Sequence, residues 1–320
     1  MGEFELIRRY FDRAPRSTNR GALLGVGDDC ALLRPDAGLE LAITTDMLVE
    51  GRHFLADAAP RSLGHKSLAV NLSDLAAMGA APRWALLALG VPAVEPKWLE
   101  EFAAGLFALA ERYGVELIGG DTTRSAQRTI SIVALGEVPA GVAMYRSAAL
   151  PGDDIWVSGE LGGAALALTH PEIEEAARRL HEPEPRVELG ERLRGLAHAA
   201  IDVSDGLTGD LGHILERSQV GAVLDYPRIP RPAALRSIAE NEGNRALERD
   251  CVLSGGDDYE LVFTADPRRR GALEALSAEL GLALSRIGAI HAGETKLVVR
   301  GADGQPMPYR PSFDHFGDAK

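Results

Sequence analysis

The chain has 320 residues, and its 34 Lys and Arg residues against 47 Asp and Glu residues give a formal net charge of −13 at pH 7. This length predicts two domains, and the acidic balance argues against nucleic acid as a partner, because phosphate backbones are bound by clustered Lys and Arg. No basic start precedes an apolar stretch, and no apolar run approaches the roughly 18 residues that cross a bilayer, so we expect a cytoplasmic protein without a membrane partner.

Hydrophobic periodicity predicts alternating helices and strands in the first half of the chain. The apolar residues of 4–13 recur at helical spacing, and those of 65–78 do so until Gly79, which is expected to end the helix. The predicted elements are, in chain order, a helix over 4–13, strands over 31–33 and 39–43, a helix over 65–78, a strand over 84–91, a helix over 98–113, and strands over 115–118 and 129–135.

A stretch rich in Gly and Pro, 136–151, separates the two halves, and we place a domain boundary there, with domains over 1–140 and 141–320. The second half is expected to contain a strand over 154–158, an Ala/Leu helix to His170, a charged helical stretch, a strand at Ile201, a helix over 207–218, and an apolar segment over 252–264 that is broken by Gly255 to Asp258. This mixed order predicts an α+β fold of α/β sandwich layers rather than a strictly parallel sheet.

Aspartates recur in short segments rich in Gly, Ser or Thr, most of them directly after an apolar run. The segments are Gly27-Asp28-Asp29, Thr44-Thr45-Asp46, Asn71-Leu72-Ser73-Asp74, Gly119-Gly120-Asp121 and Asp202-Val203-Ser204-Asp205-Gly206. Carboxylates just past strand ends can converge at one edge of a sheet, where their oxygens suit Mg²⁺. A single such Asp is more often a turn or cap residue. Five segments favour a metal-phosphate site, because clustered carboxylates without a cation repel one another.

Other phosphate-binding and catalytic patterns are missing. The sequence has no P-loop, no dinucleotide-binding fingerprint, no protein-kinase loops and no nucleophile elbow. The turn Gly159-x-x-Gly162-Gly163 follows a predicted strand and precedes a helix, which suits either a phosphate or an ordinary tight turn. Two cysteines are too few for a disulfide framework or a cysteine-based zinc site.

Six motifs in fixed order carry a resemblance to a known family. They are 25–31 (GVGDDCA), 44–46 (TTD), 65–80 (HKS through NLSDLAAMGA), 119–123 (GGDTT), 201–207 (IDVSDGL) and 254–260 (SGGDDYE). With them the chain resembles the thiamine-monophosphate kinases, members of the aminoimidazole-ribonucleotide-synthetase-like ATP-binding superfamily. The resemblance implies the two-domain fold of that superfamily and ATP-dependent phosphorylation of thiamine monophosphate to thiamine diphosphate.

The resemblance also implies roles for residues of this chain. The Mg²⁺ ligands would be Asp29, Thr44, Thr45, Asp46, Asp74, Asp121, Asp202 and Asp205. The residues in contact with ATP would be Gly120, Asp121, Arg146 and Ser204. The residues in contact with the thiamine substrate would be His53, Asp257 and Phe313. Position 257 is Asp where many family members have Glu. Several Mg²⁺ ions are implied, with an N-terminal domain that binds ATP and metal and forms a homodimer, and a C-terminal domain that completes the active site.

The chemistry of such a reaction agrees with this residue set. A phosphate monoester is already ionised near neutral pH, so we expect no protein nucleophile or general base, and we assign the aspartates to holding metal and Arg146 to a phosphate.

Two kinds of alternative remain. Another ATP-using superfamily member is possible, although a selenophosphate synthetase would have a reactive Cys before Gly27 and a hydrogenase-maturation protein would end in Cys rather than Lys320. A non-catalytic protein that binds divalent cations is the other, although the spacing of an EF-hand loop is missing.

Overall fold

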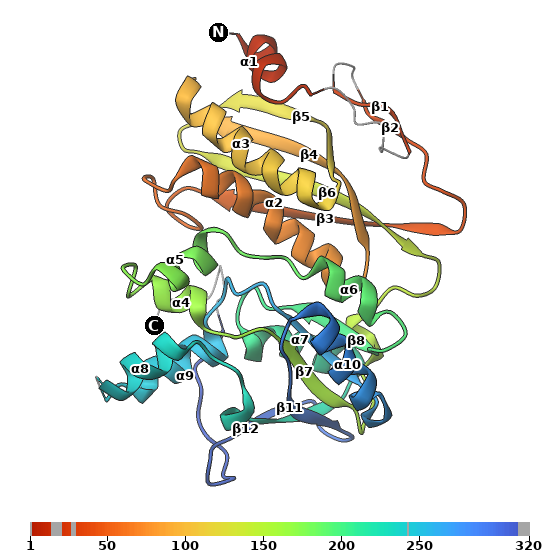
Figure 1. The fold of residues 1–320 in the computed structure, drawn as a ribbon, viewed down its shortest axis with the longest axis vertical. Helices are drawn as coiled ribbons and strands as arrows, with labels where there is room; N and C mark the ends of the chain where they lie inside the picture. Colours follow the sequence, from red (N-terminus) through yellow and green to blue (C-terminus); the bar gives the residue numbers. More distant parts are fainter. Residues whose placement is uncertain (1, 14–20, 27–29, 242, 313–320) are drawn as a thin grey trace. The chain divides into compact units, whose positions relative to one another are not determined.

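The computed structural model describes residues 2–13, 21–26, 30–241 and 243–312 (Figure 1). The chain divides into two compact units, one formed by Met1–Leu75 with Ala80–Gly141, the other by Ala76–Gly79 with Val142–Lys320. Both units combine helices with a mixed sheet, which confirms the predicted α+β fold. None of the helices in the described ranges has the length and apolar character that crossing a bilayer requires.

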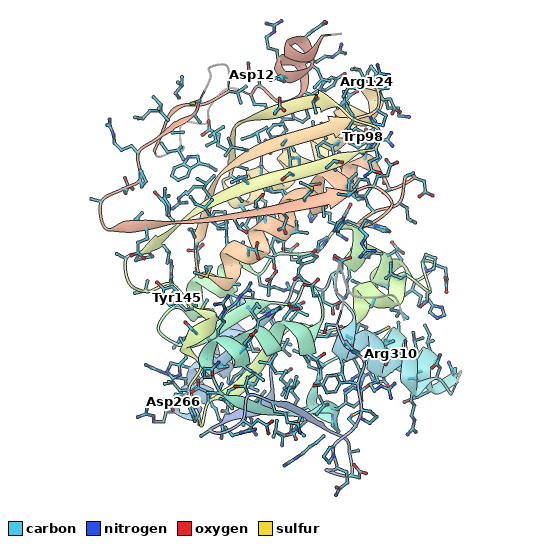
Figure 2. The ribbon with its side chains drawn as sticks, turned by 180° about the vertical axis from the view of Figure 1, so that it is seen from behind. Asp12, Trp98, Arg124, Tyr145, Asp266 and Arg310 are labelled. Atoms are coloured by element: carbon cyan, nitrogen blue, oxygen red, sulfur yellow. The ribbon has the colours of Figure 1, made fainter. Side chains whose placement is uncertain are left out.

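The first unit is built on a four-stranded sheet with the strand order β3-β6-β4-β5. Only β4 and β5 pair in parallel; β6 is antiparallel to both of its neighbours. Helices α2 and α3 lie over one face of this sheet in Figure 1, and the view from behind in Figure 2 looks onto the other face. The elements are α1 (Glu3–Tyr10), β1 (Ala22–Leu24), β2 (Leu32–Leu33), β3 (Leu39–Val49), α2 (Pro60–Ala77), β4 (Ala81–Val91), α3 (Pro96–Tyr113), β5 (Glu116–Arg124) and β6 (Thr129–Pro139).

Several predicted strands are longer than expected, and two of these extensions correct the placement of an aspartate. β3 continues through Thr44 and Asp46 because it pairs with β6 over eleven consecutive residue positions, Leu39 to Val49. β5 likewise continues past Ile118, where the predicted strand ends, and contains Asp121. Asp46 and Asp121 therefore lie within strands, not in turns past strand ends, whereas Asp202 is the last residue of its strand, as predicted.

Helices α2 and α3 approach each other closely where each has a glycine. A Cβ atom added at Gly64 would stand 2.0 Å from the carbonyl oxygen of Phe102, and one added at Gly105 would stand 1.8 Å from that of Arg61. Only a residue without a side chain fits at either position, because the neighbouring atom is backbone and cannot turn away.

We expect Gly105→Ala to lower the free energy of unfolding by about 1–3 kcal/mol, the usual cost of overpacking a core. Gly212→Ala is the matched control: Gly212 also lies in a helix, but its added Cβ would meet nothing within 4 Å. That substitution should raise stability by about 0.5–1 kcal/mol through helix propensity. Chemical denaturation of both variants checks this, and equal effects of the two would contradict the close approach.

The second unit holds a six-stranded sheet in the order β12-β9-β11-β7-β10-β8, in which β12 and β9 are parallel and the other neighbouring strands are antiparallel. The elements are η1 (Arg146–Ala148), β7 (Asp154–Ser158), α4 (Gly163–Ala167), α5 (Glu174–His181), α6 (Val187–Leu193), β8 (Ala199–Asp202), α7 (Leu207–Ser218), β9 (Gly221–Asp225), η2 (Tyr226–Arg228), α8 (Ala233–Asn241), α9 (Arg245–Ser254), β10 (Leu261–Ala265), η3 (Pro267–Arg269), α10 (Arg270–Leu280), β11 (Leu284–His291) and β12 (Leu297–Arg300).

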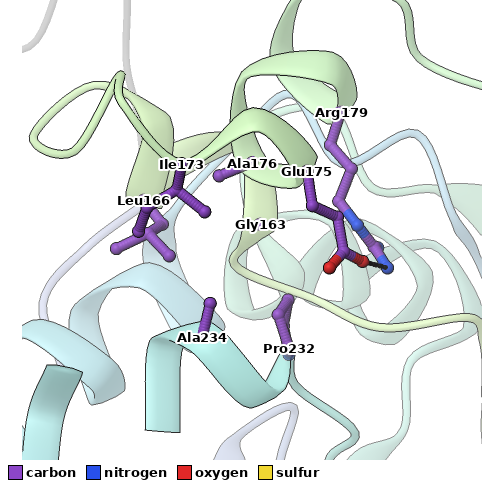
Figure 3. A pocket seen from close by; sticks show the side chains of 8 residues that line it. All are labelled: Gly163, Leu166, Ile173, Glu175, Ala176, Arg179, Pro232 and Ala234. Atoms are coloured by element: carbon purple, nitrogen blue, oxygen red, sulfur yellow. Dashed lines mark hydrogen bonds and ion pairs between the residues drawn. The ribbon is translucent and has the colours of Figure 1, made fainter. Parts of the chain in front are cut away.

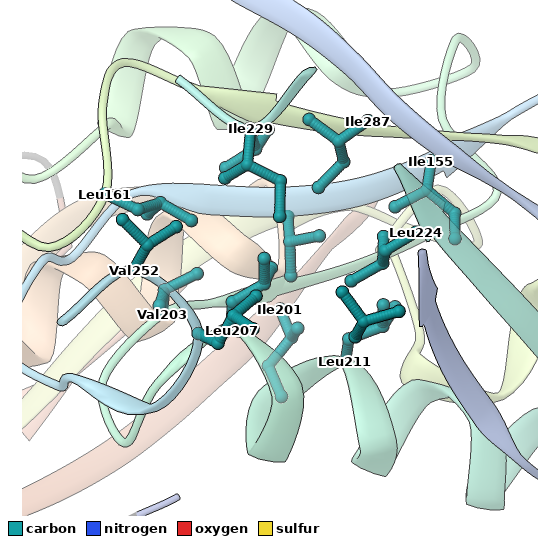
Figure 4. Close-up of a cluster of buried hydrophobic side chains, with 14 of the residues drawn as sticks. Ile155, Leu161, Ile201, Val203, Leu207, Leu211, Leu224, Ile229, Val252 and Ile287 are labelled. Atoms are coloured by element: carbon teal, nitrogen blue, oxygen red, sulfur yellow. The ribbon is translucent and has the colours of Figure 1, made fainter. Parts of the chain in front are cut away.

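The core of this unit joins the sheet to helix α7 (Figure 4). Ile155 of β7 and Ile201 of β8 pack in one buried cluster with Leu207 and Leu211 of α7. The loop between β8 and α7 therefore starts and ends on buried residues, which fixes the position of the aspartates that it carries.

Candidate active site

The first group of predicted ligands lies where β3 faces α2. The hydroxyl of Thr44 donates a hydrogen bond to the carboxylate of Asp74. The main-chain N–H of Asp46 donates to Oδ1 of Asn71 at 3.1 Å, and the amide of Asn71 in turn donates to the carbonyl oxygen of Ser67 at 3.1 Å. The structure thus brings Thr44, Asp46 and Asp74 together. It adds the fully buried Asn71 as the residue that joins the strand to the helix.

Thr45 does not join this group through its side chain. Successive residues of a strand point to opposite faces, and Thr45 is exposed while Thr44 and Asp46 on either side of it are partly buried. Only the main chain of Thr45 runs beside the other ligands.

His53 lies just beyond the end of β3, and its orientation is fixed by the main chain. The N–H of Val49 donates to Nδ1 of His53 at 3.1 Å. Because Nδ1 accepts this hydrogen bond, the proton of the neutral ring is on Nε2. In this tautomer Nε2 carries an N–H group, the kind of donor that suits a phosphate oxygen.

Gly120 and Asp121 lie on β5, at the opposite edge of the same sheet. Asp46 pairs with Ile132, Ile132 with Leu87, and Leu87 with Gly120, so Asp46 and Gly120 stand in one row across the four strands. Three inter-strand spacings amount to roughly 14 Å. Within one copy of this unit, Asp46 and Asp121 are too far apart to share an ion.

The glycine at position 120 is required by the backbone. Its φ is +149°, and an added Cβ would stand 1.9 Å from the carbonyl oxygen of Leu87. The main chain of β5 therefore lies tight against β4 directly before Asp121.

A second group of predicted ligands lies in the other unit, where two loops run side by side. Asp202 ends β8, and Ser204 and Asp205 follow it in the loop to α7. The N–H of Asp257 donates to the carbonyl oxygen of Ser204 at 2.8 Å. The structure thus brings Asp202, Ser204, Asp205 and Asp257 together.

The loop that carries Asp257 has an unusual backbone. Asp257 and Tyr259 have φ values of +66° and +49°, in the left-handed region that residues other than Gly rarely adopt. The hydroxyl of Tyr259 donates to Oδ1 of Asp257 at 2.9 Å, and its N–H donates to the carbonyl oxygen of Val203 at 2.9 Å. Sequence reasoning missed Tyr259, because no sequence pattern signals a left-handed Asp or Tyr.

Two further carboxylates hold the loops of this group. Asp210 accepts the N–H groups of Ser204, Asp205 and Gly206, and Asp258 accepts those of Gly162 and Ala164. Burial, and secondarily the charge of Asp205, raise the pKa of Asp210 to about 7. Burial also raises the pKa of Asp258 to about 7, although two N–H donors favour its charged form.

The sequence is compatible with either a phosphate site or an ordinary tight turn at Gly159 to Gly163. The hydrogen bond from Gly162 distinguishes the two. Its N–H meets Oδ2 of Asp258 at 2.6 Å, and that of Ala164 meets Oδ1 at 3.3 Å. These N–H groups are bound to a carboxylate of the protein, so the turn is a tight structural connection.

Arg146 lies away from these groups, and two other predicted site residues fall outside the described part of the chain. Arg146 is exposed, and its carbonyl oxygen accepts the hydroxyl of Ser218 at 2.8 Å, at the far end of α7 from Ser204. The 12 residues of α7 extend about 18 Å. Asp29 and Phe313 lie outside the described residues.

The donor atoms of the site suit Mg²⁺. Thr44, Asp46 and Asp74 offer only oxygen, the element that hard cations prefer. Within the ranges that the structure describes, no three Asp, Glu, His or Cys side chains are close enough to hold an ion by themselves. Such sparse sites fit Mg²⁺, which is commonly held by one or two carboxylates together with substrate phosphates and water.

Two hollows differ in what they can admit. One of about 480 Å³ is lined by Leu6, by Val91 to Val94 and by Thr122 to Arg124, the last of which Figure 2 labels. It continues along β5 from Asp121, and its size suits a small molecule. The other, in the second unit, is lined mainly by apolar groups of α4, α5 and the start of α8 (Figure 3) and measures about 10 Å³, the space of one water.

Comparison with known proteins follows the same division of the chain. Residues 27–138 match the family model of the AIR synthase related protein N-terminal domain, and residues 150–300 match that of the C-terminal domain. The curated thiamine-monophosphate kinase of Escherichia coli strain K12 is 46% identical over 327 residues, 98% of each chain. The chain belongs to the thiamine-monophosphate kinase family.

Solved structures of this family agree in fold. The thiamine-monophosphate kinase from Stenotrophomonas maltophilia K279a has a TM-score of 0.83 and 46% identity, covering 95% of this chain and 96% of its own. AaThiL complexed with AMPPCP and TMP has a TM-score of 0.77 and 31% identity, covering 88% and 89%. The family resemblance and the two-domain fold expected from the sequence are confirmed, and the roles of individual residues stay predictions.

The raised pKa of Asp258 predicts how stability depends on pH in metal-free buffer. Because the folded-state pKa of about 7 exceeds the unfolded value, this group's contribution is full at acidic pH and is lost as pH rises from about 4 to about 7. Asp258→Asn removes the titration and keeps an acceptor for Gly162. The unfolding free energy of the wild type should therefore fall more steeply between pH 4 and 7 than that of the variant.

The difference in slope should be a fraction of the about 1.4 kcal/mol per pH unit that one proton contributes. Asp57→Asn, at an exposed position, controls for the loss of one charge and should leave the slope unchanged. Parallel curves for the wild type and Asp258→Asn would contradict the assignment.

Proposed function

We propose that this protein transfers the γ-phosphoryl group of ATP to thiamine monophosphate and so forms thiamine diphosphate and ADP. The observation that carries this proposal is the end-to-end likeness to thiamine-monophosphate kinases, at 46% identity over 98% of the chain. The site geometry supports it, since the residues of several family motifs fold into two groups of oxygen ligands. This likeness does not favour the alternatives, another superfamily activity or a non-catalytic cation-binding protein.

The chemistry is a direct transfer between two phosphates. An oxygen of the thiamine monophosphate attacks the γ-phosphorus of ATP, the new P–O bond forms, and the bond to the β-phosphate oxygen breaks as ADP leaves. The attacking oxygen is already ionised near neutral pH, so no protein group has to remove a proton. Bound Mg²⁺ would supply the positive charge that lets two polyanions approach each other.

We assign the residues of the chain to holding and orienting these groups. In the first domain (1–140), Thr44, Asp46 and Asp74 hold metal, and His53 donates from Nε2 to a phosphate oxygen. Asp29, the main chain at Thr45, and Gly120 with Asp121 complete the expected ligands of metal and ATP.

In the second domain (141–320), Asp202 and Asp205 hold metal, and Ser204 and Arg146 contact ATP. Asp257 contacts the thiamine substrate, whose thiazolium ring carries a permanent positive charge that suits a fixed carboxylate. Phe313 is assigned to the same substrate. Because ATP is a co-substrate, we propose the cytoplasm as the compartment.

We further propose that the active form is a homodimer built on the first domain. Asp46 and Asp121 lie on β3 and β5, the two edge strands of one sheet, roughly 14 Å apart. A second copy that places its β3 beside β5 would bring the ligands of these two edge strands together in one composite site. The apolar side chains of Leu41, Ile43 and Met47, which are 38–62% exposed on β3, would be covered in such a pair.

The direct test is turnover of purified protein with ATP, thiamine monophosphate and MgCl₂, followed by separation of thiamine diphosphate. We expect stoichiometric ADP and thiamine diphosphate, no ADP without thiamine monophosphate, and no product in excess chelator. ADP release without the thiamine substrate would point to another superfamily activity. Binding of Mg²⁺ without any turnover would point to a non-catalytic protein.

Mixing two inactive variants tests the shared site. Asp46→Asn and Asp121→Asn should each lose most activity. In a dimer formed from one copy of each, one of the two sites regains both aspartates, so a random mixture should recover about a quarter of the wild-type activity. A mixture of Asp46→Asn with Asp74→Asn is the control and should recover none, because both changes affect the β3 side. Recovery in neither mixture would show that Asp46 and Asp121 of one active site come from the same copy, and would contradict the shared site.

A further inference from the structure

One buried carboxylate oxygen gathers the main chain of the loop between β8 and α7. Oδ2 of Asp210 accepts the N–H groups of Ser204 at 3.1 Å, Asp205 at 3.1 Å and Gly206 at 3.0 Å. Asp210 is 3% exposed and lies in the first turn of α7. N–H groups at a helix start are normally bound by a cap residue before the helix, by water or by a ligand. Here a residue inside the helix binds three in succession.

The other side of the same loop is also fixed by hydrogen bonds. Val203 donates to the carbonyl oxygen of Glu260 at 2.8 Å and accepts the N–H of Tyr259 at 2.9 Å, and Ser204 accepts the N–H of Asp257 at 2.8 Å. Because its main chain is bound on both sides, the loop offers side chains to a ligand rather than N–H groups. The side chains so directed are those of Ser204 and Asp205.

We propose that Asp210 is a positioning residue for the nucleotide and metal part of the active site. It holds three consecutive peptide groups in one orientation and thereby sets the directions of the Ser204 hydroxyl and the Asp205 carboxylate, which the proposed function assigns to ATP and Mg²⁺. The proposal rests on that function. We assign Asp210 no contact with a substrate, because it is buried and its Oδ2 atom is bound by the loop's own N–H groups.

Loss of this acceptor has two consequences that can be told apart. Three N–H groups without a partner destabilise the fold, as at any broken cap. A loop that is free to turn also loses the alignment of its two ligand side chains, which weakens nucleotide binding even where the protein is fully folded. A purely structural cap would produce only the first effect.

Asp153 provides the matched control in the same unit. It is also 3% exposed, and its carboxylate accepts the N–H of Leu150 at 3.0 Å and lies 2.9 Å from Nδ1 of His198. Asp153→Asn therefore removes a charge from a buried carboxylate that holds a turn, at a place with no assigned role in binding.

The experiment measures the dissociation constant of Mg²⁺–AMPPCP by calorimetry, the KM values for ATP and thiamine monophosphate, and the melting temperature. For Asp210→Ala we expect the dissociation constant and the KM for ATP to rise about tenfold or more, with a much smaller change in the KM for thiamine monophosphate. Asp210→Asn keeps one acceptor oxygen and should lie between the wild type and Asp210→Ala. Asp153→Asn should lower the melting temperature and leave nucleotide affinity within about twofold of the wild type.

The outcomes separate the two proposals. If Asp210→Ala does not fold, the positioning role is tested by comparing the dissociation constants of Mg²⁺–AMPPCP for Asp210→Asn and Asp153→Asn. Unchanged nucleotide affinity in a folded Asp210 variant, or an equal loss in Asp153→Asn, overturns the positioning role. If the wild type binds Mg²⁺–AMPPCP but does not phosphorylate thiamine monophosphate, the proposed function fails, while weaker nucleotide binding in the Asp210 variants still supports the positioning role.

Discussion

The mutual repulsion of carboxylates is the constraint on which the site depends. Most of the residues that we propose to hold cations against phosphates are acidic, and the protein already has a net charge of −13. The fold offsets the repulsion between acidic side chains in two ways: hydrogen-bond donors bind some of the carboxylates, and others lie far apart. Asp74 accepts the hydroxyl of Thr44, Asp210 accepts three N–H groups, and Asp46 and Asp121 lie on opposite edges of one sheet. The carboxylates can therefore be held in position for metal binding before any cation is bound.

Most of the secondary structure could be predicted from the sequence, but the extent of the edge strands could not. The helix that ends at Gly79 and the helix that ends at Gly114 carry local signals, and both end close to where the sequence predicts. The continuation of β3 through Thr44 and Asp46 depends on pairing with β6, about 90 residues later in the chain. A residue type typical of turns then lies in the middle of a strand, because tertiary hydrogen bonds outweigh local preference.

The same distinction applies to the candidate site. Thr44 and Asp74 were predicted together, and their side chains do meet. Asp210 had a readable signal, an acidic residue in the first turn of a predicted helix, but nothing local indicated that it would bind three N–H groups of a ligand loop. The position of Arg146 beside Ser218 of α7 could not be predicted, since it depends on where η1 packs. Sequence motifs thus supply the members of the site, and packing decides which of them meet.

The loop of Asp257 illustrates how packing can offset an unfavourable local conformation. Two non-glycine residues in the left-handed region cost on the order of 1–2 kcal/mol each. They are held there by N–H groups that donate to the carbonyl oxygens of Val203 and Ser204, and by the Tyr259 hydroxyl that fixes the Asp257 carboxylate. An Asp is about 1.5 Å shorter than the Glu that the family resemblance leads us to expect at this position. The Asp257 carboxylate has fewer rotamers than a longer side chain, so its position is set mainly by the backbone. Because that backbone is held through Val203 as well as Ser204, and by the Tyr259 hydroxyl, the proposed thiamine contact depends less on Asp210 than the proposed nucleotide ligands do.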